Sequence, residues 1–332
     1  MSDRPKATIT ALGHYLPDYV LTNAELEQLV DTNDEWIKTR TGISERRILK
    51  DPDKATAFMG GQVAHEILKK RGIEGSEIDC IIVATVTPDY FFPATACLIQ
   101  REIKAVNAYG FDVSAACSGF LYALSTGAML IESGRYKKVM VIGSDKMSSI
   151  VDYTDRTTCI IFGDAAAGVL LEPSTDGSGI QDVIQRCDGN EAELLRQEGG
   201  GSLNPASHET VDSKKHFIRQ EGRIVFKKAT ESMADVSLEI LKRNALSHDD
   251  VSWFVPHQAN NRIISATAKR MGVSMDKVMV NIDRYGNTTA ATIPLCLYEW
   301  QDKLKEGDNV ILASFGGGFT WGSVYINWGK TF

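Results

Sequence analysis

The sequence has 332 residues, which is enough for roughly two domains. Hydrophobic residues make up 43% and charged residues 24%, ordinary values that exclude a disordered, collagen-like or coiled-coil chain. The net charge of −7 argues against nucleic-acid binding without a local basic patch, and no apolar run reaches the roughly 18 residues of a membrane-spanning helix.

Short apolar runs alternate with helical patterns along the chain. The predicted strands are Ala7–Leu12, Asp79–Val86, Tyr109–Val113, Val139–Gly143, Thr158–Phe162, Ala167–Leu171, Val251–Val255, Val310–Phe315 and Ser323–Trp328. The predicted helices are Ala24–Val30, Ala55–Arg71, Ala94–Ile103, Ser118–Ser133, Ala229–Asn244, Ile263–Met271 and Thr289–Leu304. This interleaving predicts βαβ units and a largely parallel sheet.

Two local patterns add detail to these elements. Thr22 and Glu25 have the spacing of a capping box at the start of the first helix. The polar segment Cys187–Gly222 interrupts the alternation and predicts a long loop or insertion.

The two halves of the chain echo each other weakly. In the first half a predicted strand leads to a small-residue turn at Cys117, then to a helix and to the strand that begins at Val139. In the second half the same order surrounds Asn287 and the strand from Val310, at similar spacings. The order suggests a duplicated α/β unit with a site between its halves.

The cysteines, histidines and glycines do not form the sequence motifs of disulfide, metal or nucleotide sites. The six cysteines include no C-x-x-C pair, and Met1–Val20 lacks the pattern of a secretion signal, so we expect free thiols in a cytoplasmic protein. The six histidines lack metal-ligand spacing, and neither a P-loop nor a dinucleotide-binding glycine motif occurs. We therefore expect no metal and no nucleotide cofactor.

Cys117 is the candidate nucleophile. It follows a predicted strand and precedes an apolar helix, so free backbone N–H groups and the helix dipole would favour its thiolate. Its small neighbours allow a sharp turn like a nucleophile elbow, although the G-x-S-x-G pattern is absent. The alternative is a small buried core residue, which is the interpretation we favour for Cys80, Cys97, Cys159 and Cys296.

His257 and Asn287 are candidate partners of this thiol. His257 follows an apolar strand, at the edge where sites form in parallel sheets, but it also fits an ordinary loop histidine. Asn287 precedes a helix and is either an N-cap or an amide donor to a substrate carbonyl.

Glycines and basic residues provide two further candidate features. Gly316–Gly318 follow a strand, which suits either an oxyanion hole or a plain turn. Lys227, Lys228, Arg262, Lys269 and Arg270 are either a solvated face or a basic patch for an acidic partner.

Cys117, His257 and Asn287 together permit nucleophilic acyl chemistry. With their surroundings, they resemble the β-ketoacyl-acyl-carrier-protein synthase III family, the initiating condensing enzymes of type II fatty acid synthesis. The resemblance runs from about Ile9 to Trp328. Its strongest stretches are Asn33–Ile43, Phe111–Phe120, Asp155–Asp164, Pro256–Thr267, Tyr285–Ala291 and Phe315–Gly322.

The resemblance implies a thiolase-like α/β fold, a five-layer α-β-α-β-α sandwich that is usually a homodimer. Its two similar halves would be 1–172, with Cys117, and 173–332, with His257 and Asn287. The implied reaction is a decarboxylative condensation of a short acyl-coenzyme A, expected to be acetyl-coenzyme A, with malonyl-acyl carrier protein. It needs neither metal nor redox cofactor, and it involves no nucleic acid or membrane.

The resemblance also implies individual roles. Cys117 would be acylated, His257 and Asn287 would polarise the malonyl thioester carbonyl, and the backbone N–H groups of Cys117 and Gly317 would form the oxyanion hole. The implied substrate contacts are Trp36 and Arg156 around the adenine of coenzyme A, Arg40 near its phosphates, Phe315 beside the nucleophile and Phe92 in the partner subunit's acyl pocket. The implied carrier-protein contacts are Lys227, Arg262, Lys269 and Arg270.

Three departures from the family pattern leave every catalytic group in place. The segment Cys187–Gly222 is longer and more polar than the family pattern, which could change the acyl group that the enzyme prefers. Asn261 stands where the family has a leucine-like residue, and Ser118 stands where it has an alanine. The alternatives are a related condensing enzyme of secondary metabolism, a thioester hydrolase and a non-catalytic partner of the same fold. Hydrolysis without malonyl substrate would identify a thioester hydrolase. The presence of Cys117, His257 and Asn287 argues against a non-catalytic partner.

Overall fold

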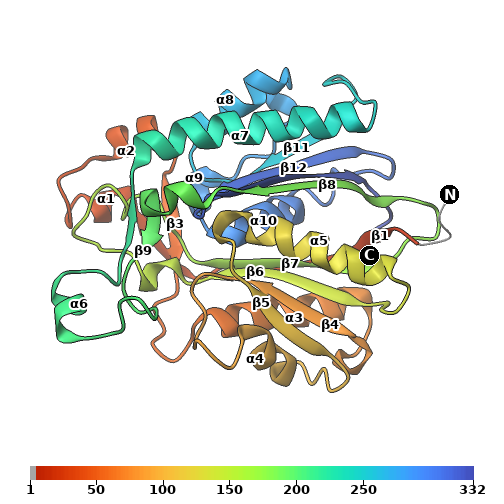
Figure 1. Ribbon diagram of the computed structural model, residues 1–332, viewed down its shortest axis with the longest axis horizontal. Coiled ribbons are helices and arrows are strands. Elements are labelled where there is room, and N and C mark those ends of the chain that lie inside the picture. Colours follow the sequence, from red (N-terminus) through yellow and green to blue (C-terminus); the bar gives the residue numbers. More distant parts are fainter. Residues whose placement is uncertain (1–4) are drawn as a thin grey trace.

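The computed structural model describes residues 5–332, which fold into five layers in the order α-β-α-β-α (Figure 1). Residues 1–4, which belong to the segment Met1–Val20 and to the expected half 1–172, lie outside the described residues.

The first sheet has five strands in the order β1-β7-β6-β4-β5. Their bounds are β1 Ala7–Tyr15, β4 Cys80–Ala84, β5 Tyr109–Val113, β6 Val139–Asp145 and β7 Ala165–Pro173. Helices α3 (Thr56–Arg71) and α4 (Thr95–Glu102) cover its outer face (Figure 1). Strands β4 and β6 are buried along their whole length, as expected for strands covered by helices on both faces.

The second sheet has four strands in the order β11-β12-β13-β8. Their bounds are β8 Gly179–Cys187, β11 Trp253–Pro256, β12 Asn309–Gly316 and β13 Thr320–Asn327. The long helix α7 (Gly222–Arg243) covers the outer face of this sheet, and α8 (Asn261–Met271) packs beside it (Figure 1).

Two apolar helices form the layer between the sheets, α5 (Gly119–Glu132) and α10 (Thr292–Glu299) (Figure 1). They share one core with strands of both sheets. A short 3-10 turn precedes each helix, η2 (Ala116–Ser118) before α5 and η6 (Thr289–Ala291) before α10. Each turn contains a residue with positive φ, Ala116 at 46° and Thr289 at 53°. The weak echo in the sequence thus corresponds to two matching turn–helix units.

Smaller elements complete the fold around the edges of the layers. Near the N-terminus they are α1 (Asn23–Leu26), α2 (Asp34–Thr41), β2 (Tyr19–Thr22) and β3 (Glu45–Ile48). Further along the chain they are β9 (Leu195–Gln197), α6 (His208–Asp212), β10 (Ile218–Gln220) and α9 (Ile282–Tyr285). The capping box at Thr22 and Glu25 is present, but α1 ends after one turn.

The prediction of a largely parallel sheet is wrong, because both sheets are mixed. Parallel pairing joins β4 to β5, β4 to β6 and β11 to β12, whereas β1, β7, β8 and β13 pair antiparallel. Strand β8 was not predicted because its outer residues are polar and partly exposed. Within residues 5–332, no helix is long and apolar enough to span a bilayer.

The predicted strand Thr158–Phe162 is also wrong. The segment is a turn apart from one isolated bridge between Phe162 and Asn287. The Asp155 carboxylate accepts hydrogen bonds from the backbone N–H of Thr157 and from the hydroxyls of Thr157 and Thr158, and such local bonds compete with a strand ladder. The predicted insertion Cys187–Gly222 contains β9, α6 and β10, and α7 begins at Gly222 rather than at Ala229.

Candidate active site

Cys117 lies on a sharp turn between β5 and α5. Ala116, directly before it, adopts the left-handed conformation, which costs a residue with a side chain about 1–3 kcal/mol. Hydroxyl groups of the second sheet hold this turn. Ser314 Oγ donates to the Cys117 carbonyl at 2.7 Å, and Thr320 Oγ1 donates to the Ala115 carbonyl at 3.0 Å. The unexpected Ser118 adds a third bond, from its Oγ to the Thr320 carbonyl at 2.9 Å.

The Cys117 side chain is only 9% exposed. Burial, and to a lesser extent the carboxylate of Asp145, raise the pKa of its thiol to about 12, against the opposite effect of hydrogen bonding at the site. The expectation that backbone N–H groups and the helix dipole would favour the thiolate is therefore not met, because burial has the largest effect on the pKa of this thiol. The resting group is a thiol.

His257 follows β11, and its backbone N–H donates to the Ala313 carbonyl of β12 at 2.8 Å. Its side chain is 2% exposed, and burial lowers the pKa of the imidazole to about 3, so the ring is neutral at physiological pH. The ring Nδ1 lies 2.7 Å from Thr292 Oγ1. The ring Nε2 is buried and has no hydrogen-bond partner among residues 5–332.

Asn287 serves as a local cap and as a candidate donor at once. Its Oδ1 accepts a hydrogen bond from the backbone N–H of Thr289 at 2.9 Å, at the start of η6. Its backbone is fixed to the loop after β6, since its N–H donates to the Ile161 carbonyl and its carbonyl accepts from Gly163. With the oxygen engaged, the amide N–H₂ is the end left free to donate in the cavity that Asn287 lines.

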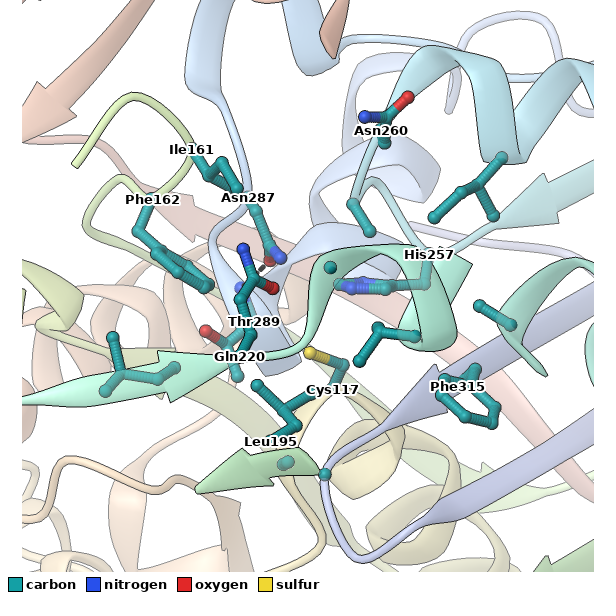
Figure 2. A pocket seen from close by; sticks show the side chains of 18 of the residues that line it. Cys117, Ile161, Phe162, Leu195, Gln220, His257, Asn260, Asn287, Thr289 and Phe315 are labelled. Carbon is teal, nitrogen blue, oxygen red and sulfur yellow. Dashed lines mark hydrogen bonds between the residues drawn. The ribbon is translucent and has the colours of Figure 1, made fainter. Parts of the chain in front are cut away.

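These three side chains converge on one cavity of about 890 Å³. Figure 2 shows the Cys117 sulfur, the His257 ring and the Asn287 amide facing a common space, with Leu195 next to Cys117. Phe315 also lines the cavity. Leu195 comes from β9 and Gln220 from β10, so the segment between Cys187 and Gly222 supplies part of the cavity wall.

The glycine loop after β12 packs directly on the nucleophile. A Cβ at Gly316 would lie 2.6 Å from the backbone nitrogen of Cys117, so only glycine fits there. Gly317 lines the cavity, and Phe315 is held by ring contacts with Phe319 and Trp321, at centroid distances of 4.8 and 6.4 Å.

Comparison with known proteins identifies this arrangement. Residues 111–189 match the family model described as 3-oxoacyl-[acyl-carrier-protein (ACP)] synthase III, and residues 241–328 match the model of its C-terminal part. A β-ketoacyl-[acyl-carrier-protein] synthase III of Chlorobium phaeovibrioides is 60% identical over 326 residues, 97% of this chain and 99% of the relative. The chain belongs to the β-ketoacyl-acyl-carrier-protein synthase III family. It is therefore an acyltransferase of the condensing type.

Other family members and related structures agree with this assignment. The protein named β-ketoacyl-[acyl-carrier-protein] synthase III 2 of Bacteroides thetaiotaomicron is 53% identical, covering 98% of each chain. The crystal structure of the Aquifex aeolicus synthase III superposes with a TM-score of 0.90 at 44% identity, over 97% of this chain and all of that one. The priming β-ketosynthase of the R1128 polyketide pathway gives 0.92 at 31% identity, covering 99% and 98% of the two chains. The thiolase-like fold is thereby confirmed.

Two family-implied residues, Trp36 and Arg40, line the cavity, and a third, Arg156, packs on Trp36. Trp36 and Arg40 belong to α2, a helix that was not predicted, and Arg156 lies in the loop after β6. The guanidinium carbons of Arg156 and Arg40 lie 5.4 and 5.8 Å from the Trp36 ring centroid. Arg156 also donates to the Asp31 carbonyl at 2.9 Å. Asn260 Nδ2 donates to the Arg40 carbonyl at 2.9 Å, which ties α2 to the start of α8.

The remaining family-implied residues are the carrier-protein contacts and Phe92. Arg262 lies at the cavity mouth, where its guanidinium carbon is 5.2 Å from the Phe226 ring centroid. Lys227 and Lys269 are exposed on α7 and α8, whereas Arg270 pairs with Asp235 at 2.6 Å. Phe92 lies outside the cavity and is 87% exposed.

Several residues of this site had no signal in the sequence. Ser314, Thr320 and Thr292 contact the functional residues only through the tertiary fold. Asp145, at the end of β6, accepts bonds from Thr85, Val86 and Thr87, and burial raises the pKa of its carboxyl to about 6. Residues 5–332 contain no group of three or more His, Cys, Asp or Glu side chains arranged to hold a metal ion.

Proposed function

We propose that this condensing enzyme joins a short acyl group from coenzyme A, acetyl in the first place, to malonyl-acyl carrier protein through a thioester on Cys117. The observation that carries the proposal is the convergence of one thiol and two uncharged side chains able to donate hydrogen bonds on a single cavity. The names of the relatives, which specify an acyl-carrier-protein substrate, support it.

In the first half-reaction Cys117 attacks the acyl thioester. The backbone N–H groups of Cys117 and Gly317 are the donors for the tetrahedral oxyanion, and the N-terminal end of α5 stabilises the negative sulfur. The carbon–sulfur bond to coenzyme A breaks, and the proton of the Cys117 thiol leaves on the coenzyme A sulfur. A thiol pKa of about 12 makes the free thiolate rare, so deprotonation has to be coupled to substrate binding.

In the second half-reaction malonyl-acyl carrier protein loses carbon dioxide. Negative charge develops on its thioester oxygen, where a neutral His257 N–H and the Asn287 amide can donate hydrogen bonds. The resulting carbanion attacks the acyl carbon on Cys117, the new carbon–carbon bond forms, and the Cys117 sulfur leaves and regains a proton. The products are β-ketoacyl-acyl carrier protein and carbon dioxide.

The carrier protein would dock on the α7–α8 face. Lys227, Arg262 and Lys269 are exposed there and form a local basic surface on a chain with a net charge of −7. Such a surface can bind an acidic partner. Arg270 contributes less, because Asp235 already neutralises it. Coenzyme A would use Trp36 and Arg40, which line the cavity, and Arg156 beside Trp36, where a guanidinium can stack on the adenine.

The protein would act as a homodimer in the cytoplasm. Phe91 and Phe92 are 83% and 87% exposed, unusual for large aromatic side chains, and Tyr90 before them is also exposed. Burial against a second subunit would cover them and bring Phe92 toward the partner's acyl pocket.

A second candidate is priming of a secondary-metabolite pathway by the same chemistry with another starter. The likeness to the R1128 priming β-ketosynthase supports it. Residues of β9 and β10 line the cavity, so differences in this wall would change which acyl group the enzyme prefers.

Intact-mass spectrometry tests the proposed function. The protein and Cys117→Ala would be incubated with acetyl-, butyryl-, isobutyryl- and octanoyl-coenzyme A, and then chased with malonyl-acyl carrier protein. We expect an acyl adduct that requires Cys117 and that disappears into a β-ketoacyl product, with acetyl as the best donor. Preference for a longer starter would support the second candidate. An adduct lost equally fast without malonyl substrate would contradict both and indicate a hydrolase.

A further inference from the structure

The proton position on His257 decides what the ring can do in this site. A neutral imidazole has one N–H and one lone pair, and only the tautomer with its proton on Nε2 can donate toward a substrate oxygen. Nε2 is the buried ring nitrogen without a partner among residues 5–332, on a ring that lines the cavity. The contact made by Nδ1 therefore sets the tautomer.

That contact is Thr292 Oγ1 at 2.7 Å. Thr292 is 2% exposed and is the first residue of α10. Its single hydroxyl proton has two possible acceptors, His257 Nδ1 at 2.7 Å and the Thr289 carbonyl at 3.1 Å. Hydroxyl donors normally lie 2.5–3.0 Å from an oxygen acceptor, so the carbonyl contact is long. If the hydroxyl donates to the carbonyl, Nδ1 must carry the ring proton and donate to Oγ1; because the carbonyl contact is the longer one, the hydroxyl is assigned as donor to Nδ1, which places the ring proton on Nε2.

The same turn also orients Asn287. The backbone N–H of Thr289 engages Asn287 Oδ1 at 2.9 Å, which leaves the amide N–H₂ as the free end. One segment, Thr289–Thr292, thus contacts both Asn287 Oδ1 and His257 Nδ1. We propose that Thr292 is a positioning residue that holds His257 in its Nε2–H tautomer, so that the Thr289–Thr292 turn presents two donors to the cavity. This inference rests on the proposed function for its catalytic consequence, but not for the tautomer itself.

The tautomer can be read directly by nitrogen-15 NMR of the full-length protein labelled at histidine, with His257→Ala used to assign the signals. We expect a protonated Nε2 and an unprotonated, hydrogen-bonded Nδ1 for His257, without any substrate. A protonated Nδ1 in this spectrum would overturn the proposal, and this measurement needs no variant at Thr292.

The nearly isosteric Thr292→Val variant removes the hydroxyl. We expect a mixed His257 tautomer and a malonyl decarboxylation rate roughly 10- to 100-fold lower, the range found when a hydrogen-bond partner that orients a metal-bound imidazole is removed. Acylation of Cys117 should change less than about threefold, because its oxyanion donors are backbone groups. Thr292→Ser, which keeps the hydroxyl, should restore both the spectrum and the rate.

Thr267→Val is the matched control, since Thr267 is a fully buried threonine on α8 that does not line the cavity. It should leave the His257 spectrum and both half-reactions unchanged. A Thr292→Val protein with an unaltered His257 spectrum or an unaltered decarboxylation rate would refute the proposal. If the wild-type protein shows the Nε2–H tautomer but no condensation with any donor, the proposed function fails while the tautomer assignment stands.

Discussion

Cys117 and His257 are both uncharged at rest because each is buried without an opposite charge beside it. Burial raises the pKa of the Cys117 thiol to about 12 and lowers that of the His257 imidazole to about 3. A thiolate–imidazolium pair, as in thiol hydrolases, would require the reverse shifts. The neutral pair suits an imidazole that donates a hydrogen bond rather than one that activates water.

The pH dependence of Cys117 alkylation tests this charge state. The thiolate fraction of a group with so high a pKa should rise roughly tenfold per pH unit from pH 7 to 10 without a plateau. Peptide mass spectrometry after brief iodoacetamide treatment measures the rate at Cys117, with a free small-molecule thiol as reference. A plateau below pH 8 would show a stabilised thiolate and would contradict the neutral resting pair.

At the scale of elements, the nucleophile turn is built jointly by segments of both sheets. Ala116 and Cys117 follow β5 of the first sheet, whereas Ser314 and Thr320 of the second sheet donate to the carbonyls of Cys117 and Ala115. The strained φ of Ala116 is sustained by these bonds and by the glycine loop packed against it. The position of the thiol thus depends on the contact between β12 and η2.

Ser314→Ala removes the hydroxyl that engages the Cys117 carbonyl, and Ser323→Ala provides a matched control. Ser323 is equally buried and makes the same kind of bond, from its Oγ to the Leu312 carbonyl at 2.8 Å, away from the thiol. Each change should lower the free energy of unfolding by about 1–2 kcal/mol. Only Ser314→Ala should also slow acylation of Cys117. Equal acylation rates in the two variants would contradict the role proposed for the bond from Ser314 to the Cys117 carbonyl.

The sequence predicted those elements whose buried residues form a clear apolar pattern, and it missed elements that lack one. Strands β4 and β6 and helices α3 and α5 were predicted because burial gives them long apolar patterns. Helix α2 was missed because only Ile37 and Thr41 in it are buried, and Thr158–Phe162 failed because the Asp155 bonds favour a turn.

The candidate site shows the same division. Cys117, His257 and Asn287 stood out by residue type and position before a helix or after a strand, and the structure brings them to one cavity. The charge state of Cys117 and the contacts of Ser314 and Thr292 could not be predicted, because burial and contacts between distant segments exist only in the folded chain.

At the scale of the whole molecule, the exposed aromatic segment before α4 is what a second subunit would cover. If Phe92 limits the depth of the partner's acyl pocket, Phe92→Ala should extend the accepted starters to octanoyl-coenzyme A and leave acetyl transfer nearly unchanged. Phe91→Ala is the neighbouring control, since Phe91 is similarly exposed. Unchanged donor preference for Phe92→Ala, in a protein that sediments as a dimer, would contradict this role.

The distribution of charge makes a second prediction at this scale. Arg262→Glu should raise the KM for malonyl-acyl carrier protein several-fold and leave that for acyl-coenzyme A nearly unchanged, and the effect should shrink with added salt. Lys242→Glu is the control, because Lys242 lies at the far end of α7, about 22 Å along the axis from Lys227. A similar rise in both KM values for Arg262→Glu would rule out carrier-protein docking at this face.

The division of labour within the site is the central claim, and the two half-reactions can be measured separately on His257→Ala and Asn287→Ala. Each variant would be acylated with acetyl-coenzyme A, followed by intact mass, and then mixed with malonyl-acyl carrier protein while carbon dioxide release is recorded. We predict near-normal acylation of Cys117 and a loss of decarboxylation of about 100-fold or more, as expected when an oxyanion donor is removed. Equal loss of both half-reactions would show that these residues serve the nucleophile instead, and would contradict the account.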